Sequence, residues 1–571
     1  MIIWQSKSLF TGCCLKKFSF SALALFLIIF ISSCGGTGKF RTPEPIPGDQ
    51  APVSEPQFRS INIPKNGFEK LITDQIEQSF DLSRQLRNLS GRRKQAINID
   101  AFGEVANSSW FINQNGAKRM SIAEISRGPN SGEGPDTSRT WTVVGAKAEG
   151  VTPGFTIQDS RGDRYVIKFD PMGYSELATG AEVVCTKLFH AAGYHVPENY
   201  IVYFHPRILK LGEEVSFTDK KGRKRFMNPV DLDEILERIE RLPDGHLRAV
   251  ASKFISGFKG PFKYKGTRKD DPNDMIAHQH RRELRGLRVI AAWLNHYDTK
   301  DNNTGTAYTE EGYVKHYLMD FGSTLGSQGD EPMPPEIGHE NATVDAHQLL
   351  KNIVTLGFYV RPWEKVKPIR YPSIGYFRSD IFHPQKYKFI LPNPAFELMT
   401  NLDGYWGAKI VMSFTDEQLE AAVAEGQYSD PEAANYLLRL LIERREIVGR
   451  YWFSRMNPLD RFELQQTPDG THALCFVDLA VETGLESAAE SRYRYDVRRN
   501  GDFVIESQVL GETCLPLPGG NGQAEPGADE TQWEVKIQTR RNSNGKWSKW
   551  VKVYLGSDNG AFSLLGVRRQ E

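Results

Sequence analysis

The stretch His296-Tyr297-Asp298-Thr299-Lys300-Asp301-Asn302-Asn303 decides how the rest of the chain is interpreted. Before it, residues 283–295 carry apolar side chains at helical spacing with arginines on the other face, which predicts an amphipathic helix. After it, residues 304–309 and 313–319 form two strand-like runs around a glycine turn. The second run ends in Asp320-Phe321-Gly322. The predicted order is therefore helix, polar loop, hairpin and a second polar motif.

These motifs, in this order, resemble the protein-kinase superfamily. HYDTKDNN resembles the catalytic loop of that family, with Tyr297 where the usual pattern has arginine, and Asp320-Phe321-Gly322 resembles its metal-binding motif. No A-P-E motif follows, so the chain looks more like divergent families such as bacterial toxin kinases and lipid kinases. The resemblance covers residues 140–460. It implies an α+β fold with two lobes, a mixed small lobe and a helical large lobe.

The upstream sequence supports this resemblance. Residues 164–169 predict a strand with Lys168 near its end, similar to the family's strand lysine that contacts ATP phosphates. A helix is predicted over 176–192, and Glu182 lies on it among small or apolar neighbours. Because a buried unpaired carboxylate is costly, Glu182 needs a cationic partner. Lys168 is the candidate, as in the family's lysine–glutamate pair, and Glu176 is the alternative glutamate.

A glycine-containing segment precedes the predicted lysine strand. Gly150 and Gly154, together with Gly145, lie between two predicted strands. Glycines let backbone amides approach phosphate oxygens, so the segment is a candidate phosphate-binding loop. The spacing is not G-x-G-x-x-G, however. A plain hairpin that contains glycine is an equally good interpretation.

The resemblance implies roles in phosphate transfer for four residues. Lys168 would hold the α and β phosphates of ATP, and Glu182 would orient Lys168. Asp298 would accept the proton of the acceptor hydroxyl. Lys300 would neutralise charge on the transferred phosphoryl group.

The resemblance also implies a magnesium site. Asn303 and Asp320 would hold the ion, since hard oxygen ligands suit magnesium. Asp301 and Asn302 are adjacent alternatives.

The first 33 residues predict a secretory signal peptide. Lysines at 7, 16 and 17 precede an acid-free apolar stretch over 18–31. Ile31-Ser32-Ser33-Cys34 then resembles a bacterial lipobox, in which Cys34 is diacylated and becomes the first residue. An uncleaved transmembrane anchor is the alternative, but the run is short for a span. The membrane, reached through lipidated Cys34, is therefore an expected partner. The expected location is the cell envelope, at the outer membrane if the host has two membranes.

The next segments predict a tether and an extension. Residues 34–65 are rich in proline and polar side chains, which predicts a flexible tether. Residues 66–139 form an N-terminal extension, with a short helix predicted over 68–86.

The last hundred residues change character. Residues 533–539 alternate apolar and polar side chains, and Asn544-Gly545 is a hairpin signal. Residues 465–571 therefore predict a small all-β, sandwich-like domain. Cys475 and Cys514 are its cysteines, and a disulfide between them is plausible in an exported protein.

Composition excludes several classes of protein. The chain has 571 residues with 71 basic and 71 acidic side chains, so no nucleic-acid partner is expected. Six cysteines exclude a disulfide-dense scaffold. One apolar run near the start excludes a multipass membrane protein.

The predicted function is that of an exported, lipid-anchored, kinase-like protein. It would bind a nucleotide–metal complex and transfer phosphate to an unknown protein or small-molecule acceptor. The alternative is a non-catalytic, pseudokinase-like binding or scaffold lipoprotein. Because ATP is scarce outside the cytoplasm, three explanations stay open: an unusual or exported donor, binding without turnover, or an incorrect lipobox assignment.

Overall fold

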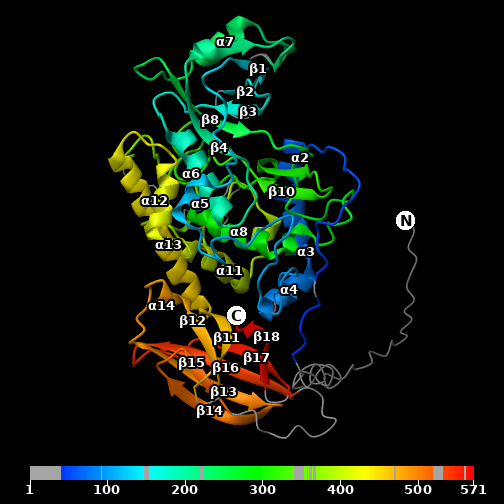
Figure 1. Cartoon of the computed structure of the whole chain (residues 1–571), viewed down its shortest axis with the longest axis vertical. Helices are drawn as coiled ribbons and strands as arrows, with labels where there is room; N and C mark the ends of the chain where they lie inside the picture. The colour runs from blue at the N-terminus through cyan, green and yellow to red at the C-terminus, as the bar shows by residue number, and fades with distance from the viewer. Residues whose placement is uncertain are drawn as a thin grey trace, which may run out of the picture.

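The fold was obtained as a computed structural model of the chain (Figure 1). It describes residues 40–44, 46–91, 93–146, 154–218, 223–339, 353–356, 358, 363, 368–468, 471–518, 531–558 and 561–571. The described chain is α+β with several sheets. In Figure 1 one sheet lies at the top, helices fill the middle and further sheets lie at the bottom.

A six-stranded sheet forms the top of the molecule, in the order β4-β8-β3-β2-β1-β5. Its neighbouring strands pair antiparallel except for β1 and β5. Alternating apolar residues from these strands share one core, as expected for a sheet with one buried face. The strands are β1 (Trp141–Ala146), β2 (Gly154–Gln158), β3 (Arg164–Lys168), β4 (Asn199–Phe204), β5 (Leu209–Leu211) and β8 (Leu247–Lys253).

Two helices accompany this sheet. The predicted helix over 176–192 is present as α6 (Leu177–Ala191), which is buried almost all round because it contacts strands β4 and β8 and helices on its other sides. The second helix is α7 (Pro229–Leu236). It begins there because Asn228 caps its first amides and a proline suits the first turn. Shorter elements are η2 (Pro206–Ile208), β6 (Ser216–Thr218) and β7 (Lys224–Phe226).

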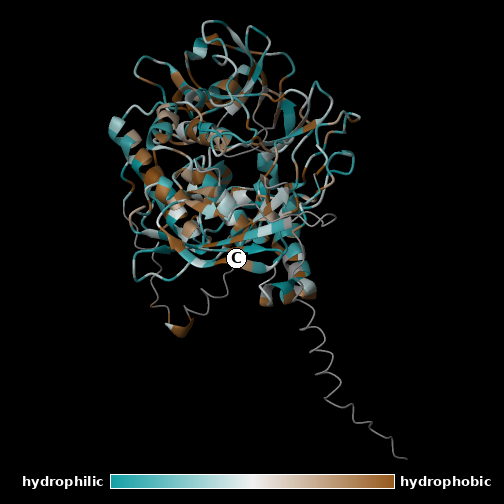
Figure 2. Cartoon of the chain, turned by 60° about the horizontal axis from the view of Figure 1, so that its bottom comes forward, coloured by the Kyte–Doolittle hydropathy of each residue, from teal (hydrophilic) through white to brown (hydrophobic). Residues whose placement is uncertain are grey.

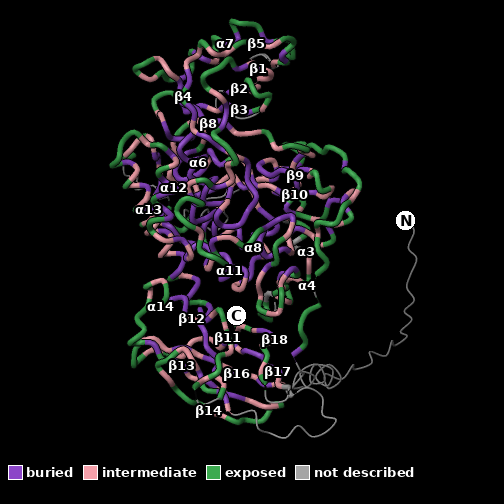
Figure 3. The backbone as a smooth tube through the Cα atoms, in the orientation of Figure 1, coloured by how far each residue is buried: buried purple, intermediate pink, exposed green. Residues whose placement is uncertain are grey.

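The middle of the molecule is a helical assembly. Hydrophobic segments, brown in Figure 2, and buried residues, purple in Figure 3, gather among its helices. The backbones of two helices approach closely where Gly286 faces Gly407, since a Cβ on Gly407 would lie 2.6 Å from the Gly286 carbonyl oxygen. The helices are α8 (Arg282–Trp293), α10 (Pro394–Glu397), α11 (Asn401–Met412), α12 (Asp416–Ala424) and α13 (Pro431–Arg455).

His195, which follows α6, offers a pH-dependent test of this packing. Burial lowers the pKa of His195 to about 3, and its Nε2 atom has no hydrogen-bond partner in the described chain. The unfolded chain protonates this imidazole below about pH 6.5 but the folded chain does not, so stability is lost as the pH falls from about 6.5 toward 3. We expect His195→Gln to reduce the acid-induced loss of unfolding free energy by about 2 kcal/mol at pH 5.

The measurement is urea unfolding at pH 7 and pH 5. His246→Gln is the control, because the His246 side chain is 40% exposed. An acid-induced loss that is equal in the wild type and in His195→Gln contradicts the prediction.

The predicted hairpin is present between α8 and the later helices. It consists of β9 (Thr304–Tyr308) and β10 (Val314–Leu318), paired antiparallel. The 3-10 turn η4 (Asp301–Asn303) leads directly into β9, and η3 (His278–His280) precedes α8. The hairpin therefore joins the loop at 296–303 to Asp320-Phe321-Gly322.

Two sheets at the bottom enclose one further core. One sheet has the order β11-β12-β15 and the other β14-β13-β16-β17-β18. The first strand begins at Leu459, before the predicted start at 465. Residues 491–510 form a hairpin, turned at Asn500 and Gly501, which both have positive φ. The elements are β11 (Leu459–Gln466), β12 (His472–Asp478), α14 (Leu479–Glu482), β13 (Ser491–Arg499), β14 (Asp502–Leu510), β15 (Cys514–Leu517), β16 (Thr531–Arg541), β17 (Val551–Asp558) and β18 (Ala561–Arg569).

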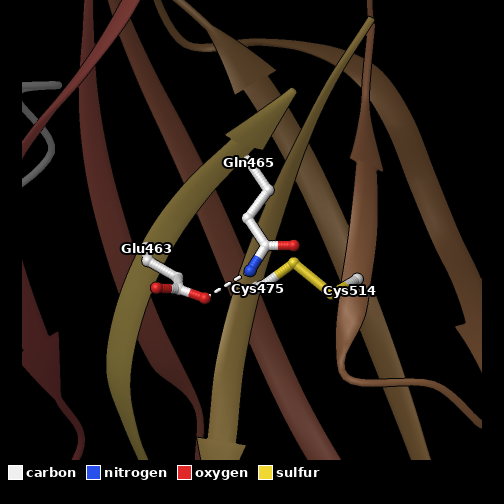
Figure 4. The surroundings of a disulfide bond; sticks show 4 residues. All are labelled: Glu463, Gln465, Cys475 and Cys514. Carbon is white, nitrogen blue, oxygen red and sulfur yellow. Dashed lines mark hydrogen bonds between the residues drawn. A yellow bond between two sulfur atoms is a disulfide. The ribbon is translucent and has the colours of Figure 1, made fainter. Parts of the chain in front are cut away.

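A disulfide joins Cys475 to Cys514, register partners on β12 and β15 (Figure 4). The two cysteines are 39 residues apart in sequence.

We expect Cys475→Ser/Cys514→Ser to lower the unfolding free energy by about 2–4 kcal/mol, because the unfolded chain is then no longer closed into a loop. Urea unfolding with and without a reductant measures this. In the control Cys185→Ser, reductant should still lower the free energy of unfolding. If reductant does not lower this free energy in the wild type, the prediction is contradicted.

Residues 40–44 and 46–62 differ from the flexible tether that we predicted over 34–65. Asp49 accepts hydrogen bonds from the backbone and side chain of Ser109 at 2.9 and 2.8 Å. Val53 donates to the Gly312 carbonyl at 2.8 Å. The ring of Phe40 stacks on Tyr554 with centroids 4.4 Å apart. The composition argument was wrong here because the folded body supplies the partners that this segment lacks.

The N-terminal extension contains short helices. Those before residue 90 lie on one side of the helical assembly (blue, Figure 1), and the last packs against α6 and α12. They are α2 (Ile63–Phe68), the π-helical turn η1 (Glu69–Thr73), α3 (Asp74–Phe80), α4 (Leu82–Leu89) and α5 (Ile122–Arg127). Among the described helices, none combines the length and the apolar character needed to cross a membrane. The domain boundaries given above stay predictions.

Candidate functional site

Lys168, at the end of β3, joins two carboxylates from distant parts of the chain. Its Nζ atom donates to Glu182 of α6 at 3.0 Å and to Asp320 after β10 at 2.8 Å. The side chains of Lys168 and Glu182 are 16% and 1% exposed. Burial alone would lower the pKa of Lys168, but the carboxylates of Asp320 and Glu182 outweigh it and raise that pKa. Three predicted site residues are therefore in direct contact, and the lysine keeps its charge.

Glu182 is oriented by contacts on both of its carboxylate oxygens. Its Oε2 accepts from Lys168, and its Oε1 accepts from the Phe321 backbone N–H at 3.2 Å and from Asn199 at 3.4 Å. Glu176, the alternative glutamate, instead accepts from the Ser429 backbone N–H at 3.0 Å. The partner of Lys168 is therefore Glu182.

The loop after α8 brings Asp298, Lys300 and Asn303 together. Lys300 Nζ donates to Asp298 Oδ2 at 2.8 Å, and Asn303 Nδ2 donates to the Asp298 main-chain carbonyl at 2.8 Å. The Met319 backbone N–H donates to the Asn303 carbonyl at 3.0 Å. Because Met319 precedes Asp320, the loop and the Asp-Phe-Gly motif form one connected unit.

A sheet lysine paired with a helix glutamate thus lies beside an Asp-Phe-Gly motif that is tied to a polar loop. This is the arrangement that the sequence motifs led us to expect. The fold is kinase-like. Phe321 of the kinase-like motif stacks on Phe189 of α6 with ring centroids 4.7 Å apart, which links the motif to the helix that carries Glu182.

His296, the first residue of the loop, packs against two aromatic rings beside this site. Its ring contacts both Phe189 and Phe321, with centroids 5.6 Å apart in each case. Burial lowers the pKa of His296 to about 4, although Asp298 and Asp320 act in the opposite direction. The imidazole is therefore neutral at pH 7 and supports Phe321 by packing.

Asp320 has a backbone conformation that few residues adopt. Its φ is 63°, in the left-handed region that aspartate tolerates better than most side chains. Residues held in such conformations concentrate at functional sites, where the surrounding contacts fix them. Here the ion pair with Lys168 is one such contact.

Asn303 and Asp320 fit a divalent ion. Magnesium is usually bound through one or two carboxylates, with water and phosphate oxygens completing the shell. Asp298 Oδ1 is buried and has no hydrogen-bond partner in the described chain, so a further acceptor oxygen lies in the same loop as Asn303. Asp301, an adjacent alternative, is instead paired with Lys70 at 2.8 Å. Within the described ranges, no three His, Cys, Asp or Glu side chains gather to form a metal site by themselves.

Of the predicted residues Gly150, Gly154 and Cys34, the structure describes only Gly154. Gly154 begins β2 and is the register partner of Lys168. Gly150 lies outside the described residues, as does Cys34. Gly154 therefore places one end of the glycine-containing segment beside the lysine.

A cavity of about 850 Å³ between α11 and the C-terminal sheets is a rival site. Four of its charged groups pair with one another: Lys409 pairs with Glu104 and with Asp460, and Arg569 also pairs with Asp460. None of the kinase-like motif residues lines it. We therefore take the arrangement around Lys168 as the candidate site.

Sequence reasoning missed two residues that support this site. Asn199 of β4 is fully buried and donates to both Glu182 and Thr186. Lys70 of η1 reaches Asp301 from 231 positions away in the chain. Neither residue stands in a local pattern that predicts its contacts.

Comparisons with known proteins add distant matches only. No family model matches the chain, and no curated protein matches it. A crystal structure of the Helicobacter pylori proinflammatory kinase CtkA is 13% identical, with 56% of this chain and 97% of that chain covered and a TM-score of 0.29. Two crystal structures of the Golgi casein kinase, one with Mn/ADP bound, are 10% and 11% identical and have TM-scores of 0.28 and 0.26. Each match covers 73% of this chain and 92% of the other chain. Since these TM-scores are below 0.5, the assignment rests on the contacts described above.

Proposed function

We propose that this chain is an exported, lipid-anchored, kinase-like protein that binds a nucleotide–metal complex and transfers phosphate to a hydroxyl acceptor. The observation that carries the proposal is the contact of Lys168 with both Glu182 and Asp320. A charged lysine held by two carboxylates can exchange one of them for phosphate oxygens. These contacts do not identify the acceptor, which is a protein or a small molecule.

Each residue has a distinct task in the proposed reaction. Lys168 binds the phosphates and Glu182 keeps it in position. Asp298 accepts the proton of the acceptor hydroxyl as that oxygen bonds to the terminal phosphorus. The bond from this phosphorus to the bridging oxygen breaks, the nucleoside diphosphate leaves with that oxygen, and Lys300 neutralises charge on the transferred group. Asn303 and Asp320 would hold a divalent ion, which would supply positive charge at the phosphate oxygens.

The proposal includes a division of the fold and a location. The six-stranded sheet with α6 forms a small lobe, α8 and α11–α13 form a large lobe, and the two C-terminal sheets form a sandwich-like domain. Cys34 carries the lipid, which places the protein in the cell envelope, at the outer membrane of a host with two membranes.

The test is a thermal shift with ATP and Mg²⁺ or Mn²⁺. A ligand at about one hundred times its Kd stabilises the folded chain by about 2.7 kcal/mol, so the melting temperature of the wild type should rise. We expect Asp320→Ala to abolish this rise because it removes a metal ligand. Asp416→Ala is the control, since the Asp416 side chain is 60% exposed and lies on α12. If wild type and Asp320→Ala both show no shift, the nucleotide-binding proposal fails.

A further inference from the structure

The helices α2 to α4 expose an unusual number of large apolar side chains. Phe68, Ile72, Ile76 and Phe80 recur every four residues and are 58%, 45%, 52% and 79% exposed. The next helix, α4, continues this series on one face, with Leu82, Leu86 and Leu89 at 75%, 66% and 85% exposed. We call these seven residues the apolar face. Contiguous exposed apolar surface marks an interaction site in a folded protein.

The same helices turn charged side chains toward the folded body. Lys70 forms a buried ion pair with Asp301 at 2.8 Å. Lys265 pairs with Asp74 at 2.7 Å and with Glu77 at 2.8 Å. A surface helix normally does the reverse and buries its apolar stripe. The apolar face therefore calls for a partner outside the described chain.

The start of the described chain indicates what that partner is. Phe40 and Arg41 line the same cavity as Gly91 and Arg93, which lie in the segment after α4. Cys34 is six positions before Phe40, a distance that an extended chain spans in about 20 Å at most. A lipid on Cys34 therefore keeps the membrane surface close to the end of the apolar face.

The charges beside the apolar face suit an anionic membrane surface. Arg41, Arg93 and Lys94 are exposed near the end of α4. Arg568 lies over the Phe40 ring, 5.1 Å from its centroid. Basic groups next to an exposed apolar helix face are typical of helices that lie in the lipid interface.

We propose that the apolar face inserts into the surface of the membrane that holds the lipidated Cys34. This is a second membrane contact, and it rests on the proposed lipid anchor. Two contacts fix the orientation of the body, whereas a lipid on Cys34 alone is a single point of attachment. The helices that lie in the membrane surface also carry Lys70, so the same segment contacts the loop of the candidate site.

The test is photo-crosslinking in the full chain, expressed with its signal in bacteria. Phe80 or Leu86 is replaced by benzoylphenylalanine, and Phe226 of β7, which is 62% exposed, is replaced as the control. After illumination, mass spectrometry identifies what is attached. We expect phospholipid adducts at 80 and 86 in about tenfold excess over 226. Crosslinks of 80 and 86 to a second copy or to another protein overturn the proposal, as do adducts equal to those at 226 or absent.

Two further measurements separate this proposal from those on which it stands. Radiolabelled palmitate should label the wild type and not Cys34→Ala, and labelling that persists in the variant overturns the lipid anchor and with it the geometric argument. The nucleotide-dependent thermal shift of the benzoylphenylalanine variants tests the kinase-like function separately. If lipid adducts form at 80 and 86 but nucleotide causes no thermal shift, the membrane contact of the apolar face stands. Only the nucleotide-binding proposal then fails.

Discussion

Asp298→Asn is expected to lower the rate of phosphate transfer by about 10²–10⁴-fold, because a positioned base contributes this much to the rate. The asparagine keeps the size of the side chain and still accepts a hydrogen bond from Lys300, which now lies 2.8 Å from the carboxylate. It cannot take up the proton of the attacking hydroxyl. Nucleotide binding should persist, since Lys168, Asn303 and Asp320 are unchanged. The measurement is transfer of labelled phosphate to candidate acceptors, together with the thermal shift.

Asp163→Asn is the matched control, because the Asp163 side chain is 42% exposed and pairs with Lys253. It should transfer phosphate at the wild-type rate. Transfer that is equal in wild type and Asp298→Asn contradicts the role of Asp298. A wild type that binds nucleotide but transfers no phosphate favours the non-catalytic alternative.

Lys70→Met is expected to lower the free energy of unfolding by about 3–5 kcal/mol, because it leaves the charge of Asp301 buried without its partner. The two side chains are 5% and 1% exposed. Asp301 Oδ2 already has no hydrogen-bond partner in the described chain, so the remaining contact of this carboxylate is with the Tyr264 backbone N–H at 3.2 Å. Urea unfolding measures the change.

Lys65→Met serves as the control, since its side chain is 75% exposed and lies 4.0 Å from Glu69. Such a surface change should stay within about 0.5 kcal/mol. The double variant Lys70→Met/Asp301→Asn removes the stranded charge and should recover part of the loss. A single variant as stable as the wild type would show that Asp301 finds another partner.

The candidate site was more predictable than the path of the N-terminal segment. Asp298, Asn303 and Asp320 stand in short motifs next to a regular helix and hairpin, and the resemblance of these motifs to those of kinases implied that the three residues share one site. Residues 46–62 offered only their composition, which predicted a flexible tether. Their hydrogen bonds go to residues far along the chain, such as Ser109 and Gly312, and composition contains no information about those partners.

The sequence by itself determined the candidate residues and the elements that carry them, because helical spacing, strand alternation and the motif HYDTKDNN are local properties of the chain. Only the tertiary structure decided between Glu182 and Glu176 as the partner of Lys168, and assigned Asp301 to Lys70. Two equal charges a few residues apart look alike in a sequence. They differ once the fold buries one beside a lysine and turns the other toward a backbone amide.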